Sequence, residues 1–453
     1  MAADESGNAK PVRPRVVVVG GGFGGLNAAL RLGDQPVDVT IVDRRNYHLF
    51  QPLLYQVALA VLSPGEIGQP IRSIVRNYKN IEVLMDEATG IDVAEQVVQL
   101  KSGTRLEYDY VVIAAGATHS YFGRDEGAAT APGLKTLEDA VEIRRRVLLA
   151  FELAEREMME TGQHRALNFV IIGGGPTGVE LAGAISDIAK LYMVKDFRHI
   201  DPSAAQVTIL EGSAKILGMY PDDLQRKARE QLQALGVTIR TNTQVTDVQP
   251  GYVMAGTERV DSVCTVWAAG VQASPLGKLL GVETDRRGCV LVDEHLNPKG
   301  LANVFICGDL AHFEQDGKPV PGVAQPAMQM GKYAAQRILE SVRGQSGTKG
   351  FRYFDKGDMA TIGRAAAVAK IEWPFKAHWS GFPAWLAWLV VHIYFLIGFR
   401  SRMSVFLHWA RTYLTFKDGV RLITGSQQLP GWEVRAADAG EITPGPLKTE
   451  ATR

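Results

Sequence analysis

Three things are scarce in this chain of 453 residues: cysteine, an excess of charge of one sign, and an apolar leader. Cysteine occurs only at Cys264, Cys289 and Cys307, none of them in a CxxC or CxxxxC pair, so neither a disulfide framework nor a dithiol centre built on such a motif is expected. Lysine plus arginine and aspartate plus glutamate each number 49, which indicates no nucleic-acid partner. Met1–Arg15 is polar, so we predict no secretory signal there and a cytoplasmic start. No metal ligands are assigned.

What the chain does contain is one strand–helix–strand pattern that occurs twice. The first copy consists of a strand, a helix and a strand at Arg15–Val19, Leu26–Leu32 and Val37–Val42. The second copy has the same order at Asn168–Ile172, Val179–Lys190 and Gln206–Leu210. Short β-branched runs around an apolar helix are typical of a βαβ unit, and their recurrence indicates an internal duplication.

Each copy has a Gly-x-Gly-x-x-Gly turn between its first strand and its helix. These glycines are Gly20, Gly22 and Gly25 in the first copy, and Gly173, Gly175 and Gly178 in the second. A side chain there would obstruct the tight turn, the approach of a pyrophosphate and the packing of helix on strand. An acid ends each second strand, where it can accept hydrogen bonds from ribose hydroxyls: Asp43 and Glu211. Because an acid repels a 2′-phosphate, Glu211 favours NAD(H) over NADP(H).

A later segment helps to assign the two sites. Val304–Asp309 is an apolar strand followed by glycine and aspartate, a pattern typical of the segment that holds the ribityl chain of FAD. Such a segment must return to the first domain, which places FAD at Gly20–Asp43 and NADH at Gly173–Glu211. The alternative is that Asp309 simply caps a helix.

The predicted fold class is α/β, with two Rossmann-like dinucleotide-binding domains and a C-terminal amphipathic helical membrane-docking segment. We expect a discontinuous FAD-binding domain, an NADH-binding domain and a membrane-associating region between two flexible tails. The expected bounds are 15–132 with 285–360 for FAD, 133–284 for NADH, 361–425 for the membrane region, and 1–14 and 426–453 for the tails.

Several stretches resemble the type II NADH:quinone oxidoreductases, a family of two-dinucleotide-binding flavoproteins. They include Val17–Leu30, His48–Ala58 and Ala324–Gly331, the last of which reads AQPAMQMG and matches that family's AQxAxQxG motif. The resemblance implies an FAD-dependent respiratory enzyme that oxidises NADH, reduces a membrane quinone and pumps no protons. It also implies a homodimer attached peripherally to the cytoplasmic face of the cell inner membrane.

The resemblance assigns roles to individual residues. FAD contacts are expected from the first glycine turn with Gly24, Asp43, Ala115 and Asp309. NADH contacts are expected from the second turn with Thr177, Glu211 and Gly270. Gln325 and Gln329 fall on the paired glutamines of the quinone pocket, Glu180 on a proton-relay position and Lys370 on a cation beside the flavin. The alternatives are a polar surface stripe for the glutamines, a helix-dipole contact for Glu180 and a solvated side chain for Lys370.

The C-terminal part suggests contact with a membrane. Pro383–Phe399 is almost wholly apolar, and as a helix it would be about 26 Å long, short of a ~30 Å bilayer core. In Met403–Phe416, apolar residues recur at helical spacing, and the cations Arg402, Arg411, Lys417 and Arg421 accompany them, which favours a helix lying flat on the membrane. The apolar residues are Phe406, Trp409, Ala410, Tyr413 and Phe416. The alternative is that both segments are core or a dimer interface.

Two other functions remain open at this point. A sulfide:quinone oxidoreductase needs at least two cysteines around its flavin, whereas the three cysteines here lie in or beside predicted scaffold strands. A flavin-binding signalling protein with little turnover would need neither quinone-pocket glutamines nor a membrane segment.

Overall fold

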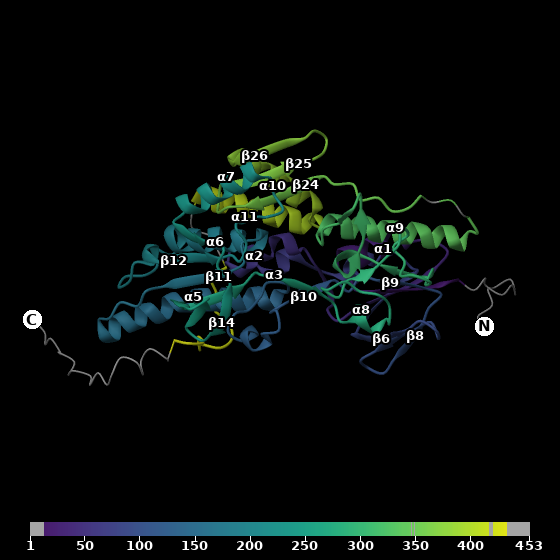
Figure 1. The fold of residues 1–453 in the computed structure, drawn as a ribbon, viewed down its shortest axis with the longest axis horizontal. Helices are drawn as coiled ribbons and strands as arrows, with labels where there is room; N and C mark the ends of the chain where they lie inside the picture. Colours follow the sequence, from purple (N-terminus) through teal and green to yellow (C-terminus); the bar gives the residue numbers. More distant parts are fainter. Residues whose placement is uncertain (1–12, 346, 348, 416–419, 433–453) are drawn as a thin grey trace, which may run out of the picture.

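The computed structural model of the protein describes residues 13–345, 347, 349–415 and 420–432. Within these residues, two parallel sheets lie at the centre of two modules, and a third, antiparallel sheet with two helices packs beside them (Figure 1). The predicted Phe416 and Lys417 lie outside the described residues, as do residues 1–12 and 433–453 of the predicted tails.

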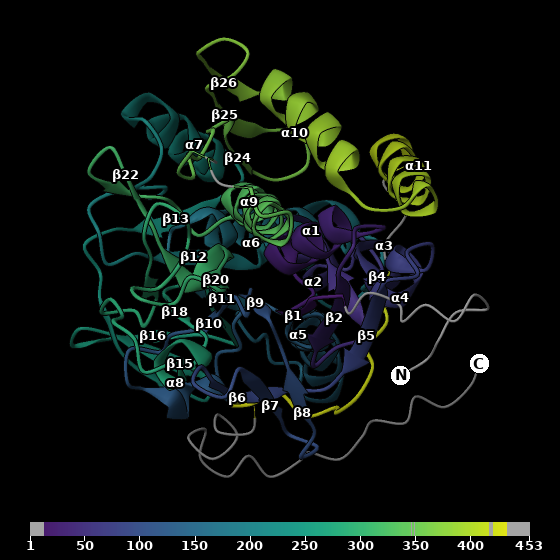
Figure 2. The same ribbon diagram turned by 90° about the vertical axis from the view of Figure 1, so that its right-hand side faces the viewer.

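The first module is built on a five-stranded sheet in the order β20-β9-β1-β2-β5, and all its neighbours are parallel. Its strands are β1 (Arg15–Val19), β2 (Asp38–Asp43), β5 (Ile81–Met85), β9 (Tyr110–Ile113) and β20 (Val304–Ile306). The valines of β1 are buried on both faces of the sheet: Val16 and Val18 pack in the core cluster of the neighbouring helices, and Val17 and Val19 pack in a cluster with Ile91 and Val98 of an antiparallel insertion. Helices α1 (Phe23–Leu32) and α9 (Ala324–Val342) pack together beside it (Figure 2).

The second module repeats this plan with a four-stranded parallel sheet in the order β13-β12-β11-β17. Its strands are β11 (Asn168–Ile172), β12 (Gln206–Leu210), β13 (Val237–Arg240) and β17 (Cys264–Trp267). Its helices are α5 (Leu137–Thr161), α6 (Pro176–Asp187) and α7 (Asp222–Ala234). The segment between α6 and β12 contains a π-helical turn at Ile188–Tyr192 and a 3-10 turn at Pro202–Ala204.

The duplication extends beyond the strand–helix–strand unit. Each module contains a three-stranded antiparallel sheet as an insertion. This insertion comes directly before β9 in the first module and before β17 in the second. These insertions are β6 (Ala88–Asp92), β7 (Val97–Leu100) and β8 (Arg105–Glu107), and β14 (Val245–Gln249), β15 (Tyr252–Ala255) and β16 (Glu258–Asp261). The two modules meet where β10 (Ala117–His119) pairs antiparallel with β18 (Val271–Ala273). The internal repeat predicted from sequence is therefore confirmed as a repeat of structure.

Short elements complete the described chain. They are β3 (Tyr47–Leu49), η1 (Gln51–Leu53), α2 (Leu54–Ala58), α3 (Pro64–Ile67), β4 (Gly68–Pro70), α4 (Ile71–Val75), η2 (Asp125–Ala128), α8 (Leu276–Leu279), β19 (Val290–Leu291), η5 (Gly308–Leu310), β21 (Ala311–His312), β22 (Glu314–Gln315) and β23 (Lys318–Pro319). Helix α2 lies in the core and packs against both α5 and α6.

The third sheet follows α9 and consists of β24 (Gly357–Thr361), β25 (Ala367–Ile371) and β26 (Ala377–Gly381). Helix α10 (Phe382–Phe395) packs on this sheet, and α11 (Phe399–Thr415) follows at the outside of the molecule (Figure 2). The apolar run predicted as one segment ends as a helix at Phe395. Within the described residues, no helix has both the length and the apolar character needed to cross a bilayer.

Two expectations about the C-terminal region were wrong. Trp409 was placed on the lipid-facing side of its helix with Phe406, but Trp409 is 9% exposed and packs on Trp388 with ring centroids 5.5 Å apart, whereas Phe406 is 49% exposed. Residues 426–432 were assigned to a flexible tail, but backbone carbonyls of this segment accept hydrogen bonds from Arg145 and Arg165. Spacing alone did not reveal these tertiary partners.

Candidate active site

The first glycine turn leaves no room for side chains where the backbone folds back on itself. Gly20 has φ +100°, and a Cβ there would lie 2.4 Å from the carbonyl oxygen of Ala114. A Cβ on Gly25 would lie 1.8 Å from the Gly20 oxygen. By contrast, a Cβ on Gly22 would have no atom within 4 Å. The turn is therefore tight at its two ends and open in the middle, as a phosphate cradle at a helix start requires.

The second turn has the same geometry. Gly173 has φ +108°, and a Cβ there would lie 2.8 Å from Ala268. A Cβ on Gly178 would lie 2.0 Å from the Gly173 oxygen, while Gly175 again faces open space. Thr177 lies in the first turn of α6, which follows this cradle. The chain therefore has two equivalent cradles, one in each module.

An acid closes each cradle in the same way. Asp43 accepts hydrogen bonds from the backbone N–H of Gly21 at 2.6 Å and of Arg45 at 2.7 Å. Glu211 accepts from the N–H of Gly174 at 2.6 Å and of Ser213 at 2.7 Å, and also from the Ser213 hydroxyl. A carboxylate has about four acceptor positions, so both acids keep capacity for a ribose hydroxyl.

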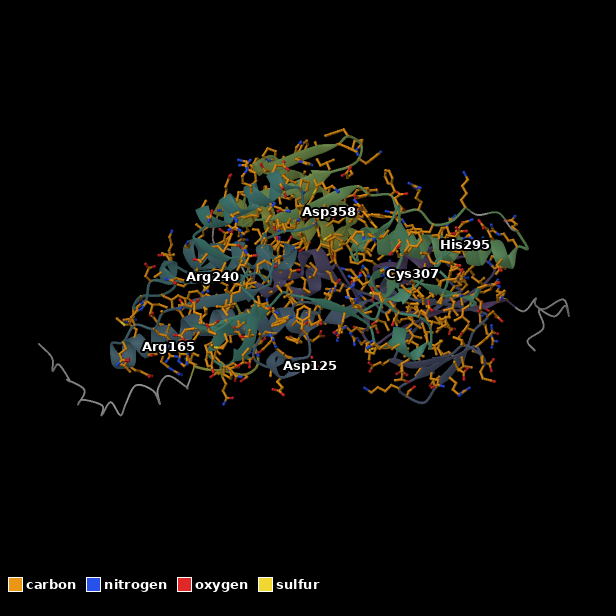
Figure 3. The ribbon with its side chains drawn as sticks, in the orientation of Figure 1. Asp125, Arg165, Arg240, His295, Cys307 and Asp358 are labelled. Atoms are coloured by element: carbon orange, nitrogen blue, oxygen red, sulfur yellow. The ribbon has the colours of Figure 1, made fainter. Side chains whose placement is uncertain are left out.

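Helix α9 begins where the first cradle meets the predicted ribityl segment. A Cβ on Gly331 would lie 2.0 Å from the Gly24 oxygen, so α1 and α9 cross in close contact. A Cβ on Gly308 would lie 3.2 Å from that of Ala327, and the neighbouring Asp309 carboxylate lies 3.8 Å from the Lys135 ammonium. The structure thus brings Gly24, Asp309 and the first turns of α9 together. In Figure 3, Cys307 marks this part of the first module, and Arg240 marks the second.

The corresponding loops after β9 and β17 contain Ala115 and Gly270. Ala115 follows Ala114, whose carbonyl touches Gly20. Gly270 has φ +75° and follows Ala268, which lies against Gly173. Each predicted contact therefore lies beside the cradle of its own module.

The two predicted glutamines of α9 differ in their surroundings. Gln325 donates from Nε2 to the Gly357 oxygen at 2.9 Å, and its Oε1 is buried with no partner among the described residues. Gln329 donates to the Phe354 oxygen at 3.0 Å and accepts from the Phe354 N–H at 2.9 Å. Gln325 therefore has a free acceptor, whereas both ends of the Gln329 amide hold a backbone segment.

Glu180 lies on α6, two residues after Gly178 of the second cradle. A Cβ on Gly183 would lie 2.5 Å from the Gly363 nitrogen, so α6 closely approaches the end of β24. There the Thr361 N–H donates to Oε1 of Glu180 at 3.5 Å. Burial raises the pKa of Glu180 to about 8, against the opposing effect of this hydrogen bond. Glu180 is therefore mainly protonated at neutral pH.

Gln325 on α9 and Glu180 on α6 contact opposite ends of the same strand, β24. Gln325 contacts Gly357, and Glu180 contacts Thr361. Four residues of strand span about 13 Å, so the two predicted quinone-site residues do not touch each other. Strand β24 is thus the element that relates them, which their positions in the sequence did not reveal.

Lys370 has acidic neighbours. Its ammonium lies 3.5 Å from Asp355 and 3.0 Å from Glu372. Burial alone would lower the pKa of Lys370, but the Glu372 hydrogen bond and nearby acids raise it, so the side chain is charged. Lys370 pairs with Asp358 in the sheet, and alternation places both on the face opposite Thr361. Figure 3 shows Asp358 in this third sheet.

Sequence reasoning missed two buried polar groups near these sites. His48 contacts the Gly21 oxygen through Nδ1 at 2.9 Å, and its buried Nε2 has no partner among the described residues. Tyr55 accepts hydrogen bonds from Gln56 at 3.0 Å and Thr361 at 2.9 Å. Both lie in or beside the stretch His48–Ala58 that carried the resemblance, which was the available signal.

The three cysteines are all free and buried. Burial raises the pKa of Cys264 to about 12, which suppresses its thiolate form. Cys264 lies in β17, whereas Cys289 and Cys307 adjoin strands of the first module. Their placement agrees with the prediction that they belong to the scaffold.

Two cradles on a duplicated α/β fold define a class of nucleotide-dependent oxidoreductase, and comparisons with known proteins agree. The family model described as pyridine nucleotide-disulphide oxidoreductase matches residues 14–331. A second model, described as the NDH2 C-terminal domain, matches residues 356–418.

Curated relatives narrow the class. A type II NADH:quinone oxidoreductase of Mycobacterium tuberculosis is 44% identical over 92% of this chain and 92% of its own length. One from Haemophilus influenzae is 30% identical over 79% of this chain and 86% of its own length. The chain belongs to the type II NADH:quinone oxidoreductases.

Solved structures share the fold. The structure of NDH2 from Plasmodium falciparum in complex with NADH has a TM-score of 0.80 at 20% identity, covering 91% of this chain and 100% of that one. A sulfide:quinone oxidoreductase from Aquifex aeolicus has a TM-score of 0.68 at 20% identity, covering 92% of this chain and 99% of that one. Architecture alone does not separate these two activities, but the identity to curated relatives does.

Proposed function

We propose that this chain oxidises NADH and uses bound FAD to reduce a membrane quinone to quinol. NADH, one proton and quinone give NAD⁺ and quinol. When bound, FAD supplies the chemistry that accepts hydride from NADH and passes two electrons to the quinone. The chain itself binds and orients the reactants and provides the remaining proton.

The equivalence of the two cradles carries this proposal. Both have a left-handed glycine, a glycine that faces open space and an acid held by backbone N–H groups. Gly22 and Gly175 mark the space in which pyrophosphate groups fit. We assign FAD to the first cradle, because Asp309 and the start of α9 lie beside Gly24, and NADH to the second cradle with Glu211. The domain bounds given above follow from this assignment.

Gln325 is the preferred quinone-site residue among the two glutamines. Its free atom is an acceptor, so it suits a ligand O–H or N–H, such as a quinol hydroxyl. The N-terminus of α9 also has no side-chain cap. Gln329 has an indirect role, because its two hydrogen bonds fix the backbone of Phe354 in the segment that leads into β24.

Glu180 is the candidate proton source. A hydride brings two electrons and one proton, but quinol formation takes two protons, so the second must come from the protein or from water. A carboxyl with a pKa of about 8 is protonated at neutral pH and can recover its proton after each turnover. Lys370 is the candidate cation beside the flavin, and its charge is shared with the ion pairs that it makes with Asp355 and Glu372.

The outer surface of α10 supports attachment to the membrane. Phe382, Leu386, Val390 and Tyr394 recur every fourth residue and are between 48% and 69% exposed. On α11, Met403, Phe406 and Leu407 are also exposed. Such a surface suits the interface of a bilayer, which would hold the lipid-soluble quinone. We infer a homodimer on the cytoplasmic face of the cell inner membrane, on the strength of the family.

One experiment tests the electron path. The purified protein is mixed anaerobically with NADH and then with a short-chain quinone while flavin absorbance is followed. We expect bleaching by NADH and recovery on addition of quinone. Bleaching without recovery would refute quinone as the acceptor, and no bleaching would refute NADH as the donor.

A further inference from the structure

A buried hydrogen-bond chain joins three elements that are distant in sequence. The indole N–H of Trp409 on α11 donates to Oε1 of Gln56 on α2 at 2.7 Å. Nε2 of Gln56 donates to the phenol oxygen of Tyr55 at 3.0 Å, and the hydroxyl of Thr361 on β24 donates to the same oxygen at 2.9 Å. These four residues are at most 9% exposed. Burying so many polar groups is costly unless they pair. The hydrogen-bond chain therefore specifies one arrangement of the three elements α11, α2 and β24.

The indole sets the direction of this chain. An indole N–H can only donate, so the oxygen of the Gln56 amide must face Trp409 and its NH₂ group must face Tyr55. A flipped amide would place two donors against each other. The contact of Trp409 with Gln56 therefore determines how Tyr55 is held.

The other end of the chain reaches Glu180 on α6. Thr361 contacts Tyr55 through its hydroxyl and Glu180 through its backbone N–H, at 3.5 Å. The titratable groups near Glu180 are Tyr55 on α2 and Tyr220 before α7. Burial chiefly raises the pKa of both phenols, and the charge of Glu180 adds to that rise, while Asp358 on β24 acts on Tyr220. These neighbours carry no positive charge that would favour an ionised Glu180.

One further acid lies near this cluster. Asp187, two turns along α6, also acts on Tyr55, and burial raises the pKa of Asp187 to about 6. Arg364 and Lys190 oppose that rise. These cations therefore act on Asp187, whereas the Thr361 N–H is the group that favours the charged form of Glu180.

Helix α11 connects the chain to the outer surface. Its inner side carries Val405 and Trp409, which are buried, and its outer side carries Met403, Phe406 and Leu407, which are between 42% and 57% exposed. A displacement of α11 by lipid would therefore move the donor of the first hydrogen bond in the chain.

We propose that Tyr55 is a positioning residue for Glu180, and that Gln56 and Trp409 couple the seating of α11 to the protonation of Glu180. The indole and the amide are not proton carriers at neutral pH. The hydrogen-bond chain therefore affects how Tyr55 and Thr361 are positioned, and it does not conduct protons. If α11 moves, Gln56 and Tyr55 reorient, and Thr361 changes its contact with the carboxyl. The enzyme would thus adjust its proton donor when it docks. This inference rests on the proposed function for Glu180 and for the α10–α11 surface.

The first test measures Glu180 directly. Infrared titration follows the protonated carboxyl band that Glu180→Gln removes. Tyr55→Phe deletes a polar group near Glu180 and loosens Thr361, so we expect the midpoint to rise by roughly 0.5 to 1 pH unit, the equivalent of about one hydrogen bond. The matched control is Tyr110→Phe, whose phenol pairs with Ser341 in the first module, and it should cause no shift.

An unchanged midpoint in Tyr55→Phe would overturn the positioning role. If Tyr55→Phe does not fold, Thr361→Val removes the same hydrogen bond from the other side and decides in the same way. A purely structural role would instead lower thermal stability without moving the titration.

The second test concerns α11. The midpoint of the Glu180 band is compared between lipid-free protein and protein bound to anionic phospholipid vesicles. We expect it to differ in the wild type and to be equal in Trp409→Phe, which keeps an aromatic ring but removes the indole N–H. Equal midpoints in the wild type would overturn the coupling. Failure of the proposed function would differ: the wild type would not sediment with vesicles or would not reduce quinone, while the Tyr55→Phe shift in lipid-free protein would persist.

Discussion

Gln325 and Gln329 lie one turn apart on α9, but only one of them has a free hydrogen-bonding group. The Oε1 of Gln325 is buried without a partner among the described residues, whereas the Gln329 amide is engaged at both ends with Phe354. A sequence motif treats the two as a pair. The structure separates a residue that can contact a ligand from one that holds the backbone.

This difference predicts that the same substitution lowers activity at one glutamine and stability at the other. Gln325→Leu should lower kcat/KM for quinone about tenfold, the equivalent of one hydrogen bond, with little loss of stability. Gln329→Leu should lower the free energy of unfolding by about 1 kcal/mol, because Phe354 loses two hydrogen bonds. Steady-state kinetics and urea unfolding measure both effects. Equal losses of kcat/KM with no change in stability would contradict the distinction.

Glu180 should make the stability of the protein depend on pH. Its pKa rises from 4.5 to about 8 on folding, so between these values the unfolded chain releases this proton while the folded chain keeps it. The unfolded state then binds fewer protons, and stability falls as pH rises through that window.

Glu180→Gln should therefore stabilise the protein relative to wild type more at pH 8 than at pH 5, by an amount of the order of a few kcal/mol. Urea unfolding at both pH values measures it. Glu95→Gln, an exposed substitution, should show no such trend. A constant difference between Glu180→Gln and wild type would argue against the raised pKa.

At the scale of elements, the two cradles are equivalent in backbone but are assigned to different cofactors. A Cβ would lie 1.8 Å from a carbonyl oxygen at Gly25 and 2.0 Å at Gly178. Such contacts force the helix away from the strand, at a cost of about 1–3 kcal/mol or more. A glycine-to-alanine substitution in one cradle therefore tests the cofactor assignment of that cradle alone.

Gly178→Ala should keep FAD but weaken NADH binding at least about tenfold, whereas Gly25→Ala should be purified with little flavin. Flavin absorbance and NADH titration report the two effects. Gly218→Ala is the control, because a Cβ there would meet no atom within 4 Å. The reverse pattern would exchange the two cofactor assignments.

At the scale of the whole molecule, the C-terminal region serves both the core and the surface. Trp388 and Trp409 are buried. Residues 420–432 run along α5, and their backbone carbonyls accept hydrogen bonds from Arg145 on α5 and from Arg165, which follows that helix. Figure 1 shows this last segment passing beside the second module. Removing everything after Phe382 would thus open the core, so docking is better tested by substitutions on the exposed stripe.

The triple variant Leu386→Ser, Val390→Ser and Tyr394→Ser should lose binding to anionic vesicles and keep NADH oxidation by a soluble acceptor. These side chains are 49%, 60% and 69% exposed, so their loss should leave the fold intact. Co-sedimentation measures binding, with Met159→Ser on α5, 63% exposed, as the control. Undiminished vesicle binding would refute docking by α10.

The sequence by itself determined the duplicated strand–helix–strand units, the two glycine cradles and the acids that close them. These features are local: a left-handed glycine or a buried β-branched strand is required by its nearest neighbours along the chain. The family motifs in Val17–Leu30 and Ala324–Gly331 added the class of reaction.

Only the tertiary structure decided which glutamine keeps a free acceptor, which side of α11 is buried, and that Tyr55 links Trp409 to the strand beside Glu180. The contacts of Thr361 with Tyr55 and of Trp409 with Gln56 join residues more than 300 positions apart. Helical spacing predicts which residues share a face but not what that face meets. Burial and hydrogen-bond pairing are properties of the assembled fold, and they alone determine which polar groups remain available for a ligand.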